Sequence, residues 1–205
     1  MMKVYSRRQL MMEMGKPYDA EIEYLGSDSH AYINTGINGN NDNVSFTGHF
    51  MYTTHINYAA VCGNYISDNH NGTRLILSEK PGYMYYNLNT KCTDSTPIQC
   101  ERNVKHSLSA NYDQVVIDSI TKTVEIQNKG TVNNGIVCLF NRSLTNIAIR
   151  NIGLKIYDFQ IYDNGILVRY FIPVRVGTVG YMYDKVSGKL FGNAGTGNFI
   201  LGPDK

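Results

Sequence analysis

The chain has 205 residues, of which 18% are charged, and its formal net charge is +2 at pH 7. This length suits one well-cored domain, and the small net charge without a basic stripe argues against a nucleic-acid partner. No run approaches the ~20 apolar residues of a membrane span, and the early basic residues are not followed by the apolar run of a signal peptide. We therefore expect a protein that folds in the cytoplasm and binds neither nucleic acid nor a membrane.

Residues 1–20 differ in composition from the rest of the chain. Five of the eight methionines lie in this segment together with four basic residues, and the segment ends before a domain that we predict for residues 21–205. The segment could be a disordered tail. It could also be a docking arm, because methionine adapts to irregular apolar surfaces and arginine pairs with carboxylates. We predict a docking arm whose anchoring side chains are Val4, Arg7, Arg8, Met11 and Met12.

From Glu21 onward the apolar residues recur with a period of two, which is typical of strands with one buried and one solvated face. The clearest alternation lies in residues 44–53, 74–78, 104–112 and 123–127. Turn-forming Gly and Asn residues separate the strands every ~8–12 residues, and we find no amphipathic helix after residue 20. Residues 136–140 are apolar on both faces and predict a central strand that is covered from both sides. The pattern predicts an all-β fold, an antiparallel two-sheet sandwich or jelly roll.

The C-terminal quarter begins with a clear hairpin signal. Asn164 and Gly165 stand between the apolar runs 154–162 and 166–172. Such a pair predicts a two-residue turn, because both central positions need a positive φ. Pro173 is expected to end the second strand, because proline cannot donate a ladder hydrogen bond.

Further turns punctuate the end of the chain. We predict a turn at Ser187 and Gly188 and a closing strand at Phe199. The glycine-rich run 192–197 superficially resembles a phosphate-binding loop. Strands rather than a helix N-terminus flank it, so we interpret it as a hairpin.

Both ends of the predicted domain resemble a known family. The segments that carry the resemblance are EIEYL (21–25), YINTGI (32–37), KIY (155–157), IYDNG (161–165), FIPVR (171–175) and YDKVSG (183–188). They resemble the start and the end of concanavalin A-like (laminin-G-like) jelly-roll domains, a variant common in proteins of gut bacteria and their tailed phages. The resemblance covers about residues 21–201, by pattern only in the middle. The arm with its Arg-Arg and Met-Met pairs is similar to the start of phage and prophage proteins of this type.

The resemblance implies a jelly roll of the concanavalin A-like lectin and glucanase type, although such a fold hosts many roles. We expect a non-enzymatic virion protein, a capsid decoration or head-fibre component, that displays a lectin-like domain. Residues 1–20 would anchor it to other virion proteins, and it would assemble in the host cytoplasm as a homo-oligomer. The alternatives are a carbohydrate-binding module for host or mucosal glycans and, last, a glucan hydrolase.

The sequence contains few residue patterns that would support an enzymatic activity. A glycoside hydrolase needs two carboxylates across the scissile bond, and none of the six glutamates lies in the family pattern Glu-x-Asp-x-x-Glu. A Ser-His-Asp site is assembled in space, but the chain has no Gly-x-Ser-x-Gly turn. His106 lies between Val104 and Leu108 in the alternation, and we interpret it as a satisfied histidine at the edge of the core.

We predict no metal and no cofactor. His49 and His55 lie six residues apart but lack a third ligand. Two loops rich in Asn and Asp offer oxygens that suit calcium, but we interpret them as Asx turns. The four cysteines show no metal-binding spacing and are expected to be free thiols, although Cys92 and Cys100 could bridge a loop.

The best ligand candidate is the strand YMYYNLN at residues 83–89. Alternation places Tyr83, Tyr85, Asn87 and Asn89 on one of its faces. Sugars bind through ring stacking and through hydrogen bonds to amides, so we predict these four as carbohydrate-binding residues. The same face could be structural, or it could be a subunit contact, where tyrosine is also enriched.

Overall fold

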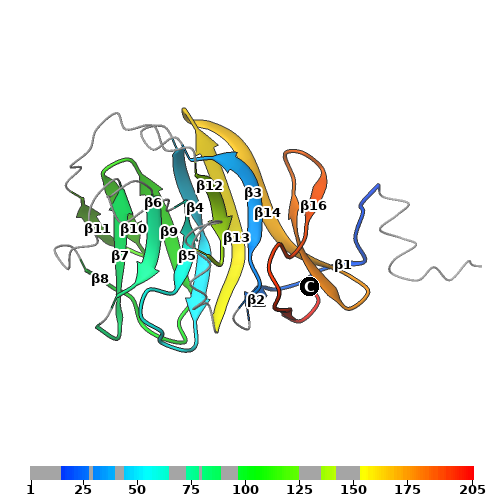
Figure 1. Ribbon diagram of the computed structural model, residues 1–205, viewed down its shortest axis with the longest axis horizontal. Helices are drawn as coiled ribbons and strands as arrows, with labels where there is room; N and C mark the ends of the chain where they lie inside the picture. Colours follow the sequence, from blue (N-terminus) through cyan, green and yellow to red (C-terminus); the bar gives the residue numbers. More distant parts are fainter. Residues whose placement is uncertain are drawn as a thin grey trace, which may run out of the picture.

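The structure is a computed structural model that describes residues 15–27, 30–39, 44–64, 73–78, 80–88, 97–124, 135–141 and 153–205. Within these residues every regular element is a β-strand, and the strands form two antiparallel sheets packed as a sandwich (Figure 1). The predicted all-β, two-sheet antiparallel sandwich of jelly-roll type is therefore confirmed. The described part of the chain contains no helix long and apolar enough to cross a membrane.

The larger sheet has 11 strands. Its main path follows the order β11 (Ile120–Thr123), β10 (Gln114–Ile117), β9 (His106–Asn111), β4 (Val44–Tyr52), β13 (Leu154–Asp163), β14 (Ile166–Val176), β15 (Val179–Asp184) and β16 (Lys189–Phe191). The branches are β1 (Ala20–Glu21), which pairs with β14, and β2 (Leu25–Ser27), which pairs with both β13 and β17 (Phe199–Leu201).

The smaller sheet has six strands. Their order is β3 (Ile33–Asn38), β12 (Ile136–Leu139), β5 (Ala60–Gly63), β6 (Thr73–Leu77), β7 (Tyr83–Leu88) and β8 (Ile98–Gln99). The strand β12, predicted from its apolar run to be central, lies between β3 and β5, and its last three residues are buried. That prediction is confirmed.

The main core fills the space between the two sheets. Phe46 and Phe159, on neighbouring strands of the larger sheet, are each 1% exposed, and their ring centroids are 5.8 Å apart. The smaller sheet contributes side chains such as Met84 and Leu139, both fully buried in the same cluster. Each such side chain contributes about 1.5–3 kcal/mol to folding when it leaves water.

The alternation of apolar and polar residues correctly predicts which side chains are buried on β4 but not on β6. On β4 every second residue is buried, from Val44 to Tyr52, as predicted. On β6 the predicted wet face is wrong, because Ile76 and Ser78 are as buried as Leu75 and Leu77, with at most 2% exposed. The reason is tertiary: β6 lies between β5 and β7, and Ile76 belongs to a second apolar cluster on the outer side of the smaller sheet.

The Asn-Gly hairpin forms as predicted. Asn164 has φ 49° and Gly165 has φ 76°, and the turn joins β13 to β14 in the register that pairs Asp163 with Ile166. Two positive φ angles match the right-handed twist of the flanking strands. The turn predicted at Ser187 and Gly188 also forms, between β15 and β16, with φ 70° at the glycine.

Pro173 does not end its strand, so this prediction is wrong. The strand β14 continues to Val176, and Pro173 pairs with Met182 of β15. The carbonyl oxygen of Pro173 accepts a hydrogen bond of 3.0 Å from the amide of Ile22, so this side of the residue faces the segment around β1. In an antiparallel strand the N–H and C=O of one residue point to the same neighbouring strand. The position that an N–H of Pro173 would occupy therefore also faces the β1 side, and its absence removes no hydrogen bond to β15.

The glycine-rich run 192–197 is not a hairpin. Phe199 does begin a closing strand, as predicted, but this strand, β17, pairs with β2, whereas β16 pairs with β15. The run is thus a connection between strands with different partners. The Asn193 side chain stabilises it by accepting hydrogen bonds from the amides of Tyr32 at 3.1 Å and Gly195 at 2.7 Å.

Candidate functional site

The strand predicted to bind a sugar is β7. Its Tyr85 is 4% exposed and packs in the cluster on the outer side of the smaller sheet, so neither face of this ring is open to a ligand. Tyr83 is half-buried, and the Lys80 ammonium lies 4.3 Å from its ring centroid. Asn87 lies in β7, but its side chain and the whole of Asn89 fall outside the described residues. Of the two tyrosines that the structure describes on this face, Tyr83 is partly open and Tyr85 is closed to a ligand.

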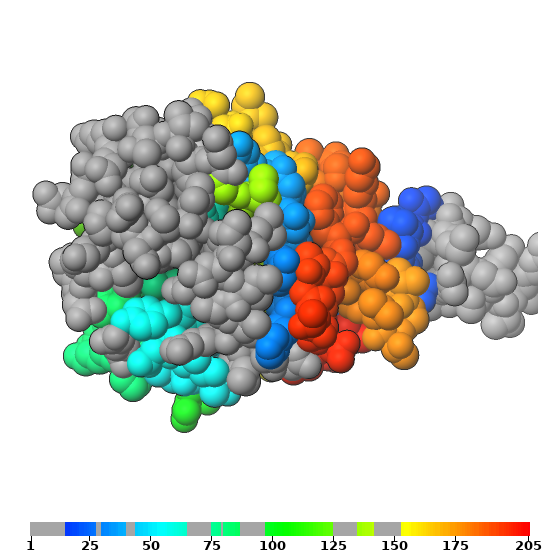
Figure 2. All heavy atoms as spheres, viewed as in Figure 1, coloured from blue at the N-terminus to red at the C-terminus, as the bar shows by residue number. Residues whose placement is uncertain are grey.

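The five predicted anchoring residues, Val4, Arg7, Arg8, Met11 and Met12, lie outside the described residues. The structure does describe the end of the predicted arm, from Gly15 to Ala20. We call residues 15–22 the β1 segment. Figure 2 shows this segment in blue against the orange β14–β15 hairpin.

Backbone hydrogen bonds hold the β1 segment on β14. The amide of Asp19 donates to the carbonyl of Arg175 at 2.8 Å, and the amide of Ile22 donates to that of Pro173 at 3.0 Å. The Asp19 carboxylate accepts from the amide of Gly177 at 2.7 Å, at the turn between β14 and β15. The chain is therefore fixed to the sheet from Asp19, two residues before the predicted start of the domain at Glu21.

Tyr18 is the side chain that secures this segment. It is 2% exposed, and its ring meets the ring of Tyr183 edge-on with the centroids 5.0 Å apart. Its hydroxyl donates to the Glu21 carboxylate at 2.9 Å, and the Lys16 ammonium lies 3.2 Å from the same carboxylate oxygen. A buried aromatic ring with a satisfied hydroxyl is a strong local anchor.

These contacts shift the titration of the three groups. Burial acts to raise the pKa of Glu21, but the hydrogen bonds from Tyr18 and Lys16 outweigh it, and this pKa lies below its usual value. The hydrogen bonds to Tyr18 and Glu21 raise the pKa of Lys16. Burial, helped by the hydrogen bond to Glu21, raises the pKa of Tyr18. All three pKa shifts favour the same protonation states: a neutral Tyr18, an ionised Glu21 carboxylate and a protonated Lys16.

We expect acid to loosen the β1 segment. Because the folded pKa of Glu21 is depressed, its contribution to stability is fully present above the unfolded value of about 4.3 and is lost as the pH falls through the folded pKa. Amide exchange of residues 19–22, corrected for its intrinsic pH dependence, should therefore quicken between about pH 5 and about pH 3. The Glu21→Gln variant should lack this acid dependence. An equal acid dependence in that variant would assign the effect to another group.

A surface rich in tyrosine adjoins the β1 segment. Apolar side chains on the side of β14, β15 and β16 away from the main core form a separate cluster around Tyr18. We call this surface the tyrosine face, and its members are Tyr170, Ile172, Val174, Val176, Tyr181, Tyr183 and Leu190. All except Ile172 and Val174 are only partly buried. The opposite side of the same strands, with Phe171 and Met182, packs into the main core.

A row of polar residues crosses the solvent side of the larger sheet. His49 on β4 is opposite Asp158 on β13 and Ser107 on β9, which is the order of a hydrolase triad. The Nδ1 atom of His49 lies 2.8 Å from the Asp158 carboxylate. The Ser107 hydroxyl, however, donates to Asp118 at 3.4 Å, so the row lacks the hydrogen bond between nucleophile and base. The geometry is that of a hydrogen-bonded histidine and carboxylate on an open sheet.

His106 is a satisfied buried histidine, as predicted. It is 3% exposed, with Nδ1 2.7 Å from the Asp118 carboxylate and Nε2 2.7 Å from the carbonyl oxygen of Glu101. Both partners accept hydrogen bonds, so both ring nitrogens are occupied. Burial acts to raise the pKa of Asp118, but its hydrogen bonds to His106 and Ser107 lower it overall.

Some of the other metal and thiol candidates lie outside the described residues, namely Cys92 and the two loops rich in Asn and Asp at residues 40–43 and 68–71. Among the described residues no three His, Cys, Asp or Glu side chains come together as a metal site would require. His55 has both ring nitrogens buried without a hydrogen-bond partner, and its ring lies 6.3 Å from that of Tyr52. Cys62, Cys100 and Cys138 are free, as predicted, and are at most 1% exposed, more deeply buried than the partial burial expected of them. Burial raises the pKa of Cys62 and Cys138 to about 12. Such thiols are inert at neutral pH.

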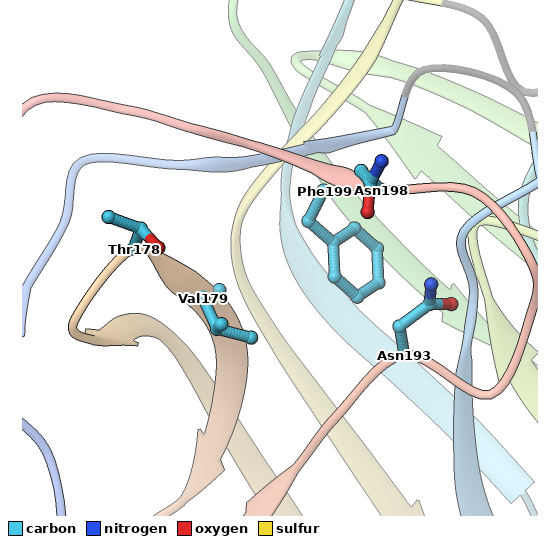
Figure 3. Close-up of a pocket in the computed structure, with 6 residues that line it drawn as sticks. Thr178, Val179, Asn193, Asn198 and Phe199 are labelled. Carbon is cyan, nitrogen blue, oxygen red and sulfur yellow. The ribbon is translucent and has the colours of Figure 1, made fainter.

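A small hollow lies between the β14–β15 turn and the start of β17 (Figure 3). It has a volume of about 180 Å³ and is lined by Thr178, Val179, Gly180, Asn193, Asn198 and Phe199. Pockets that enclose a drug-sized ligand measure ~300–1,000 Å³, so this one admits a single small group. The Asn193 oxygen is already used by two backbone amides, and its nitrogen donates to the carbonyl of Gly197. The Asn193 side chain is therefore already engaged by the backbone, and Thr178 and Asn198 supply the other polar side chains of the lining.

Comparison with models of known protein families and with curated proteins finds no match to this chain. The fold and the geometry of the described residues therefore carry the functional argument. Two features stand out: the β1 segment, through which a compositionally distinct arm joins the domain, and the tyrosine face beside it.

Proposed function

We propose that this chain is a non-enzymatic virion protein of a tailed phage of gut bacteria, a capsid decoration or head-fibre component. It attaches to the particle through its N-terminal arm and displays a lectin-like jelly roll. The resemblance at both ends of the domain to concanavalin A-like proteins of gut bacteria and their phages motivates the proposal, and the jelly-roll sandwich agrees with it.

The observation that carries the proposal is the place of the β1 segment and its contacts with the sheet. Figure 1 shows β1 at one end of the long axis of the molecule, and β7, β8 and β11 at the other end. The chain is held at that end by Tyr18 and by the hydrogen bonds from Asp19 and Ile22. A partner that binds residues 1–14 would thus hold the sandwich by one end and leave the opposite end exposed. This arrangement suits a displayed domain.

The chemistry of the arm suits attachment to a protein shell. Met11 and Met12 can fill irregular apolar gaps, and Arg7 and Arg8 can form bidentate pairs with carboxylates. Many copies on one particle would convert a weak affinity of the displayed domain for a surface into useful avidity.

Removal of residues 2–14 tests the proposal. The contacts of the β1 segment begin at Lys16, so the truncated domain should keep its thermal midpoint. Incorporation into particles, measured by quantitative mass spectrometry, should fall at least roughly tenfold, the change that corresponds to a loss of about 1.4 kcal/mol of binding.

A variant of unchanged length supplies the control. Replacing residues 2–14 by a Gly/Ser segment keeps the spacing and removes the Met and Arg side chains, and it should fail to assemble as the truncation does. Normal incorporation of either variant, or absence of the full-length protein from purified particles, would refute the proposed function.

A further inference from the structure

The tyrosine face is more apolar than the solvent side of a sheet normally is. The residues of β14 and β15 that point away from the main core include Tyr170, Val176, Tyr181 and Tyr183, and each is partly exposed. On β4, by contrast, the residues that point away from the core include Ser45, Thr47 and His49. Partly exposed tyrosines gathered on one rigid surface are typical of protein interfaces.

The charge beside this face is positive. The Lys185 ammonium lies 4.7 Å from the ring centroid of Tyr170, and the side chain is exposed. The Lys16 ammonium lies 5.5 Å from the ring of Tyr18. The Glu21 carboxylate pairs with Lys16, so these two charges offset each other, and Lys185 carries the positive charge beside this face. The arm that precedes the β1 segment adds three basic side chains, at residues 3, 7 and 8, and one acidic side chain, Glu13.

The short stretch of chain between Met11 and Tyr18 keeps the arm near the tyrosine face. Tyr18 follows Met11 by seven positions, and a fully extended chain over seven positions spans at most about 25 Å. A standard interface covers about 800 Å² on each partner, a patch roughly 30 Å across. A protein that binds Met11 and Met12 through an interface of this size is therefore large enough to contact the tyrosine face as well.

We propose that the tyrosine face is the second half of the attachment site and contacts the same partner protein as residues 1–14. This inference rests on the proposed attachment role of the arm. The partner is a different protein whose contact surface is apolar at its centre and acidic at its rim. A second copy of this chain fits less well, because a two-fold contact would bring the same basic rim against itself.

Site-specific photocross-linking tests the inference in the cell that produces the full-length protein. A benzophenone amino acid replaces Tyr181 on the tyrosine face or, as the control, Ile120, which is 37% exposed on β11 at the opposite end. If the change at 181 impairs folding, the same probe replaces Val176, on the same face. Position 181 or 176 should cross-link to one acidic protein, identified by mass spectrometry, and position 120 should not.

Charge reversal supplies the second readout. Lys185→Glu should reduce the cross-link several-fold, whereas the matched variant Lys122→Glu, on the exposed strand β11, should leave it unchanged. A cross-link to a second copy of the chain, an equal yield from position 120, or no cross-link from the tyrosine face would overturn the inference. An acidic partner that is not a particle component would refute the virion role and support the interface, so the two failures are distinguishable.

Discussion

Replacing Asp184 by alanine should lower the free energy of unfolding by about 3–5 kcal/mol, the cost of removing one partner from a buried charged pair. The carboxylate is fully buried and accepts hydrogen bonds from the amides of Tyr170 at 2.8 Å, Val186 at 3.1 Å and Ser187 at 3.2 Å. It also accepts from the Ser187 hydroxyl at 2.6 Å, and Arg169 lies 3.6 Å away. Alanine leaves all these donors without their acceptor. Urea denaturation followed by circular dichroism measures the loss.

Two control variants test whether the loss of stability comes from the hydrogen bonds of Asp184 or from the removal of any aspartate. Asp184→Asn keeps the shape of the side chain but replaces one of its two acceptor oxygens by an NH₂ donor. The remaining oxygen can accept hydrogen bonds on the Tyr170 side or on the Ser187 side but not on both, so an intermediate loss of stability is expected. Asp163→Ala removes a half-buried carboxylate that accepts from the Asn164 amide at 3.1 Å, and it should change stability by no more than about 0.5 kcal/mol. A loss below about 1 kcal/mol for Asp184→Ala would contradict the role of the network.

The sequence predicts best the features that depend on a few neighbouring residues. The Asn164-Gly165 turn follows from the φ angles that a two-residue hairpin demands, and the structure contains those angles. The alternation on β4 follows from one buried and one solvated face. Both signals are local, and the surrounding fold does not alter them.

The predictions that failed depend on neighbours far away in the chain. Ser78 is polar, yet it is fully buried because β6 is covered on both faces, and its hydroxyl is satisfied by hydrogen bonds to the backbone of Lys80. Pro173 is tolerated because its missing N–H faces the β1 segment and not β15. Residues 192–197 looked like a hairpin, but β17 pairs with β2, which is far away in the chain.

The candidate site was partly visible in the sequence. Compositional change located the arm, but composition cannot show where a chain begins to pack, and Tyr18 packs on the domain before the change is complete. The tyrosine face had a signal that sequence reasoning passed over: residues 170–174 and 181–183 are apolar at every position but Pro173, and so are apolar on both faces. In β12 such a pattern marks a covered central strand. In β14 and β15 it marks a face that stays partly exposed.

Replacing Tyr18 by alanine should free the β1 segment from the sheet at a cost of about 3 kcal/mol, near the lower end for truncating a large aromatic side chain. The lower end applies because the cluster around Tyr18 lies near the surface and can partly collapse into the gap. Tyr18→Phe is the matched control, because it keeps the ring against Tyr183 and removes the 2.9 Å hydrogen bond to Glu21. That variant should cost about 1 kcal/mol.

Amide exchange distinguishes a local loss from a global one. In Tyr18→Ala the amides of Asp19 and Ile22, which donate to β14, should exchange faster, while those of β4 and β13 should keep most of their protection. Unchanged protection at Asp19 and Ile22 would show that backbone pairing alone holds the segment. Under the proposed attachment role of the arm, Tyr18→Ala should leave binding of the arm to its partner unchanged but should no longer fix the orientation of the sandwich, because the buried ring of Tyr18 holds the segment on the sheet. The proposal thus predicts that attachment and orientation are separable, the first depending on residues 1–14 and the second on the ring of Tyr18.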